Sequence, residues 1–141
     1  MLAGWSERFE EALVAALLAR LLVAPRDRQA DRDLAAAIIT ALSTRETTID
    51  RFFFDWRGGR VPGGVYSSEP FRALARLLSE RERPLSHAYW ADAAPCSMHI
   101  EEVEAIWSAI AERDDWAPLE AKVAAVRRMG EALTQDAPAA A

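Results

Sequence analysis

The chain has 141 residues, 51% hydrophobic and 28% charged, proportions typical of a globular domain, which most often has about 100–150 residues. Its net charge of −5 arises in residues 99–141, because acids and bases balance over residues 1–98; we therefore expect no nucleic-acid partner. One cysteine excludes an internal disulfide, and with neither a basic leader nor an apolar run long enough to span a bilayer we expect a cytoplasmic protein without membrane contact.

Two amphipathic helices are predicted first along the chain. Apolar residues recur every four positions from Phe9 to Leu21, which predicts a helix over about residues 5–22 that ends before Pro25. A second helix is predicted over about residues 31–42, with its apolar line on Leu34, Ile38 and Leu42 and aspartates near its positive N-terminal end. The apolar stripes are wide, so each helix needs neighbours on more than one side.

An aromatic cluster marks a short third helix, capped by Thr47 or Thr48 and ending near Gly58. Its four aromatic residues are Phe52, Phe53, Phe54 and Trp56. Consecutive helical residues point about 100° apart, so the four side chains cannot share one face. One interpretation makes them a candidate interdomain contact with another helix, domain or chain. The alternative is a helix buried on every side within this domain.

A glycine-rich loop is predicted over residues 58–64. No strand leads into it and it contains no lysine, so we expect a flexible connector rather than a phosphate cradle. A fourth helix is predicted from a cap at Ser67 or Ser68 to before Pro84. Residues 85–94 are compatible with a short helix or with an irregular loop.

Two longer helices are predicted in the acidic C-terminal third. Ser97 caps the first, over about residues 98–112, and Pro118 opens the second, which ends at about residue 133. We therefore expect an all-α fold, an irregular array of six or seven helices in one domain over residues 1–133. Residues 134–141 are expected to form a disordered tail.

No complete catalytic, cofactor or metal site is predicted. Cys96 and His99 are three positions apart beside a helix start, but they supply only two of the four ligands of a structural zinc site. His99 and Glu102 share a helix face, and metal sites in helical bundles need further carboxylates from other helices. Acid pairs such as Asp114-Asp115 remain solvated on our interpretation, which leaves them unsuited to acid–base catalysis.

Two stretches of sequence resemble a known family. The first is Asp-Arg-Phe-Phe-Phe-Asp-Trp-Arg-Gly-Gly over residues 50–59. The second is Glu-Glu-Val-Glu-Ala-Ile-Trp-Ser-Ala-Ile-Ala-Glu-Arg-Asp-Asp-Trp over residues 101–116, followed by Glu-Ala-Lys over 120–122 and Arg-Met-Gly-Glu-Ala-Leu over 128–133. Together they resemble the C-terminal region of the SelO (YdiU) protein adenylyltransferase family in its proteobacterial form, with residues 60–96 matching least.

The resemblance implies a kinase-like enzyme that transfers AMP from ATP to protein hydroxyls with magnesium. In that family the catalytic, nucleotide-binding and metal-binding residues lie in the larger N-terminal part, so none is carried over to this sequence. The implied partner is that kinase-like portion, in the same or a neighbouring chain, and the chain alone would be inactive. Our alternative is a free-standing helical interaction or oligomerisation module. A third hypothesis, an independent metal or thiol enzyme around Cys96 and His99, has the least support.

Overall fold

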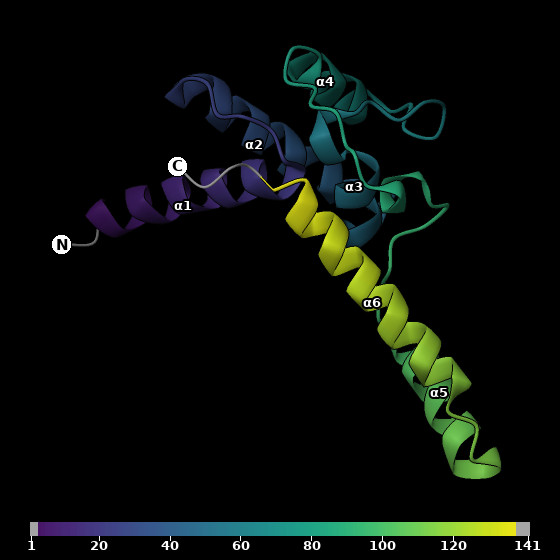
Figure 1. Ribbon diagram of the computed structural model, residues 1–141. Helices are drawn as coiled ribbons and strands as arrows, with labels where there is room; N and C mark the ends of the chain where they lie inside the picture. Colours follow the sequence, from purple (N-terminus) through teal and green to yellow (C-terminus); the bar gives the residue numbers. More distant parts are fainter. Residues whose placement is uncertain (1–2, 138–141) are drawn as a thin grey trace. The chain divides into compact units, whose positions relative to one another are not determined.

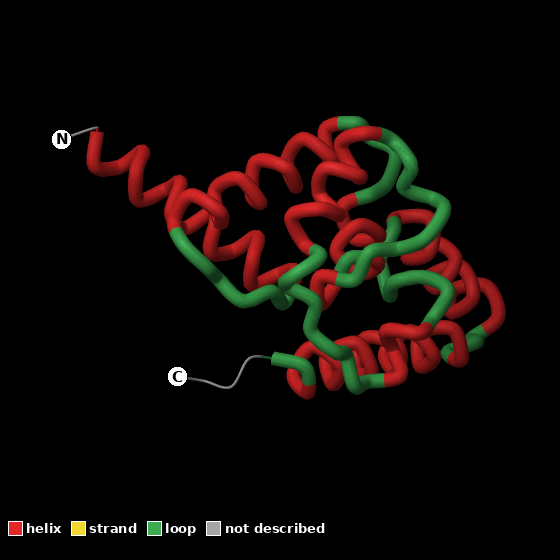
Figure 2. The backbone as a smooth tube through the Cα atoms, turned by 90° about the horizontal axis from the view of Figure 1, so that it is seen from above, coloured by secondary structure: helices red, strands yellow, loops and turns green. Residues whose placement is uncertain are grey.

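Helices account for all the regular structure in residues 3–137, the part of the chain that the structure describes, and none of these residues lies in a β-strand (Figure 2). The computed structural model thus confirms the predicted all-α fold. Its elements are α1 (Ala3–Leu21), α2 (Arg28–Ser43), α3 (Ile49–Asp55), the 3-10 turn η1 (Arg57–Gly59), α4 (Glu69–Leu78), the 3-10 turn η2 (Ala88–Ala91), α5 (Ile100–Arg113) and α6 (Ala117–Gln135) (Figure 1).

The chain divides into two compact units, Met1–Leu85 and Ser86–Ala141, where the sequence predicts one helical domain over residues 1–133. The division follows Pro84, in a stretch without helical structure between α4 and η2. A proline there removes a backbone donor and fixes its own φ angle, which opposes a continuous helix. We refer below to residues 1–85 as the first unit and to residues 86–141 as the second unit.

Helices α1 and α2 of the first unit lie side by side and run in the same direction (Figure 1). Arg28 at the start of α2 is paired with Glu7 and Glu11, and Arg32 one turn later is paired with Glu10. The connection over residues 22–27 therefore returns along α1 before α2 begins. Asp27 caps α2 by accepting hydrogen bonds from the backbone N–H groups of Gln29 and Ala30, which have no partner within the helix.

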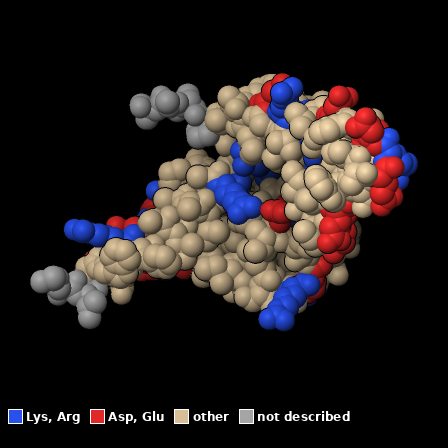
Figure 3. All heavy atoms as spheres, turned by 90° about the horizontal axis from the view of Figure 1, so that it is seen from below, with Lys and Arg blue, Asp and Glu red and all other residues tan. Residues whose placement is uncertain are grey.

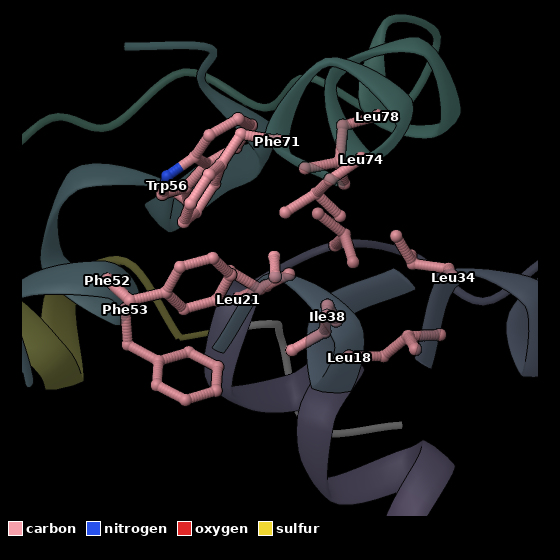
Figure 4. Close-up of a cluster of buried hydrophobic side chains, with 12 residues drawn as sticks. Leu18, Leu21, Leu34, Ile38, Phe52, Phe53, Trp56, Phe71, Leu74 and Leu78 are labelled. Carbon is pink, nitrogen blue, oxygen red and sulfur yellow. The ribbon is translucent and has the colours of Figure 1, made fainter. Parts of the chain in front are cut away.

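The core of the first unit lies between α1, α2, α3 and α4 (Figure 4). In the close-up, leucines of α4 point toward Leu34 and Ile38 of α2, and the indole of Trp56 lies against the ring of Phe71. The largest side chains with less than 2% of their surface exposed are Trp56, Phe52, Phe71, Leu21, Leu34, Ile38, Leu74 and Leu78. At about 25 cal/mol per Å² of buried apolar surface, this cluster is the main stabilising contribution within the unit.

An ion pair anchors the end of the first unit to its beginning. The guanidinium of Arg81 lies 2.6 Å from the carboxylate of Asp31, and both side chains are almost completely buried. Asp31 also accepts the backbone N–H of Arg26 on both carboxylate oxygens, at 3.0 and 3.1 Å. These bonds join the start of α2, the connection before it and the segment after α4.

In the second unit, α5 and α6 form an antiparallel hairpin, joined at residues 114–116 (Figure 1). Asp114 ends α5 in the left-handed conformation, with φ of 51°, and Asp115 accepts the backbone N–H of Ala117 at the start of α6. These two acids therefore shape the turn between the helices. Asparagine and aspartate adopt this conformation more readily than most residues because their side chains bond locally.

The last helix is longer than the sequence predicts. α6 includes Thr134 and Gln135, and Asp136 is buried with 6% of its surface exposed. The predicted tail over residues 134–141 thus begins with ordered residues, because Asp136 has hydrogen-bond donors around it that periodicity does not reveal. Residues 138–141, at the end of the predicted tail, lie outside the described residues.

Candidate docking surfaces

The aromatic cluster of α3 lies in the core. Phe52, Phe53, Phe54 and Trp56 have 0, 6, 5 and 1% of their surface exposed. The rings of Phe52 and Trp56 stack at 5.9 Å, and Trp56 stacks on Phe71 at 6.0 Å. This burial favours a helix enclosed by the chain itself, the second of the two interpretations. Contact of the cluster with a further domain or chain stays a prediction.

The neighbouring glycines serve a structural purpose. Gly58 and Gly59 form η1 with φ of 71° and 72°, and the backbone of residues 81–83 lies directly against them. A Cβ at position 58 would come within 2.6 Å of the carbonyl oxygen of Arg83, and Arg83 donates its N–H to the Gly58 carbonyl at 2.7 Å. The first part of the predicted flexible connector is therefore a buried, close backbone contact.

Cys96 and His99 have different surroundings in the structure. The half-buried Cys96 donates its backbone N–H to the Tyr89 hydroxyl, and His99 precedes α5 with its side chain exposed. Glu102 is 2.6 Å from the ammonium of Lys122 on α6. Among residues 3–137, no three histidine, cysteine or acidic side chains gather as metal ligands would.

A buried carboxylate holds the two ends of the second unit together. Asp136 accepts hydrogen bonds from the backbone N–H and hydroxyl of Ser86 and from the indole N–H of Trp90, at 3.0, 2.7 and 2.6 Å. Burial by itself would raise the pKa of Asp136, but these donors outweigh it and lower that pKa to about 2. We call Ser86, Trp90 and Asp136 the clasp.

A groove lies along one side of the α5–α6 hairpin, with a volume of about 400 Å³. Four of its lining residues are alanines, and the ion pair of Lys122 and Glu102 also lines it. The lining residues are Glu102, Ala105, Ile106, Ala109, Arg113, Pro118, Ala121, Lys122 and Ala125. The ammonium group of Lys122 also donates a hydrogen bond to the carbonyl of Ser97, so both partners of this group lie within the second unit.

Exposed apolar side chains form a stripe along the first half of α1. Trp5, Phe9 and Leu13, four positions apart, expose 71, 61 and 36% of their surface. We call these three residues the α1 stripe. Phe9 and Leu13 belong to the same periodic apolar line as Leu21, yet only the C-terminal end of that line lies in the core. The α1 stripe is an unpartnered apolar surface of the kind that marks interaction sites.

A second set of exposed apolar residues lies on the α5–α6 hairpin. Ile100, Val103 and Trp107 of α5 expose 63, 40 and 69% of their surface, and Val123 and Val126 of α6 expose 39 and 38%. The sequence marks these residues as the apolar faces of their helices but cannot tell that the faces remain uncovered. Sequence reasoning therefore missed both surfaces, although their spacing was evident.

The charged groups on the face shown in Figure 3 form no continuous basic surface. Its blue groups are separate, with neutral surface or acidic groups between them. Among the described residues, no helix is both long enough and apolar enough to cross a membrane. Comparison with protein-family models, with curated proteins and with solved structures gives no match for this chain.

Proposed function

We propose that this chain is the helical C-terminal segment of a SelO-type protein adenylyltransferase and acts by docking onto its kinase-like catalytic part. The α1 stripe carries the proposal, because Trp5 and Phe9 are large aromatic side chains left 71 and 61% exposed on one helix face. Exposed tryptophan is among the residues that contribute most binding energy in protein interfaces. The chain would supply a binding surface, and the partner would supply ATP, magnesium and the reacting groups.

The residues that carry the family resemblance form helices of both units. Residues 50–59 form α3 and η1, whose aromatic rings pack in the core of the first unit. Residues 101–116 form most of α5 and the turn after it. On this proposal, these segments hold the helices in place, and the exposed stripe makes the contact.

Genomic sequence upstream of the codon for Met1 gives the first test. We expect kinase-like coding sequence there, in frame or displaced by a frameshift, or in a neighbouring gene. Its complete absence would contradict the SelO-type proposal and leave the alternative below.

Reconstitution gives the second test. The purified chain is incubated with that kinase-like part, ATP labelled in its α-phosphate and magnesium. We expect labelled protein only when both parts are present, and a loss of at least about tenfold with the double variant Trp5→Ser, Phe9→Ser. The matched control is Ile39→Ser, on α2 of the same unit, where an apolar side chain is 46% exposed outside the stripe. Labelling by this chain alone would contradict the proposal.

A free-standing helical interaction module is the second candidate function. The observation that favours it is the self-contained core of the first unit, where eight large side chains are almost completely buried without any other chain. In that case the α1 stripe binds a different protein. Binding of the chain to its partner would then be lost with Trp5→Ser, Phe9→Ser although no adenylyl transfer depends on it.

A further inference from the structure

We draw no further inference here: the strongest candidate, the set of exposed apolar side chains on the α5–α6 hairpin around Trp107, carries none, because nothing in the structure shows what covers it.

Discussion

At the scale of single residues, Asp136 shows how a carboxylate can hold a small unit closed. Its pKa of about 2 lies below the ordinary value of 3.8, so the folded state favours the ionised form. The clasp therefore contributes its full stability above pH 4, and this contribution is lost as the pH falls from about 4 toward 2. The difference between these two pKa values corresponds to about 2–3 kcal/mol.

We predict that Asp136→Asn destabilises the second unit by about 1–3 kcal/mol, because an amide group would place its own N–H against one of the donors in the clasp. The variant should also lose the decline in stability between pH 4 and pH 2 that the clasp causes. Urea unfolding followed at several pH values measures both effects. Glu131→Gln, which alters an exposed carboxylate on the same helix, is the control and should change neither.

Two glycines with the same backbone conformation allow the close contact at η1 to be measured. Gly58 and Gly64 both have φ of 71°, but a Cβ would touch the Arg83 carbonyl at position 58 and nothing within 4 Å at position 64. Gly64→Ala should cost about 1 kcal/mol for the left-handed conformation alone. Gly58→Ala should cost at least about 2 kcal/mol more. Equal losses of stability in thermal unfolding would show that the contact adds nothing.

At the scale of helices, α1 changes its role along its length. Its C-terminal half contributes Leu18 and Leu21 to the core, with 3 and 0% exposure, while its N-terminal half carries the α1 stripe. Ion pairs to Arg28 and Arg32 hold that N-terminal half beside α2. Such exposed pairs contribute little to stability, typically about 0–1 kcal/mol each, so the first turns of α1 depend mainly on their own helix propensity.

We predict that apolar substitutions along α1 divide into two groups. Leu21→Ala should destabilise the first unit by about 2–5 kcal/mol, since it empties a fully buried site. Phe9→Ala should change stability by less than about 0.5 kcal/mol, because that ring is already in solvent. Urea midpoints of the two variants make the comparison. A large loss with Phe9→Ala would mean that the stripe is covered within the chain.

The elements themselves were largely predictable from the sequence. Proline and capping residues set the helix ends, as at Thr48, which accepts the N–H of Arg51 at the start of α3. Which faces are covered was not predictable, because periodicity describes one helix and burial depends on its neighbours. Phe9 and Phe52 are both aromatic residues at helical spacing, yet one is 61% and the other 0% exposed. The same limit explains why the two candidate docking surfaces emerged only with the fold.

At the scale of the whole molecule, the two units differ in the size of their hydrophobic cores. The first contains the cluster around Trp56, Phe52 and Phe71, whereas the large buried apolar side chains among the described residues of the second are Tyr89 and Trp90. Which helices share a core depends on tertiary packing, which the periodicity of each helix does not reveal. The sequence therefore predicted a single domain. Small units with few buried side chains are marginally stable.

We predict that a fragment of residues 1–85 folds alone, with helical circular dichroism and one cooperative thermal transition. The fragment of residues 86–141 should be much less helical at low concentration, because it buries little apolar surface by itself. A non-cooperative 1–85 fragment would show that the first unit depends on the rest of the chain.

The positions of the clasp residues in the sequence also determine when the second unit can fold during protein synthesis. The clasp joins Ser86 to Asp136, so the second unit can close only after the ribosome has released Asp136 at the far end of α6. All the residues of the first core, by contrast, precede residue 86, and domains generally fold in order as they emerge during translation. The nascent chain would therefore carry a folded first unit while Ser86 and Trp90 still lack their bonds to Asp136.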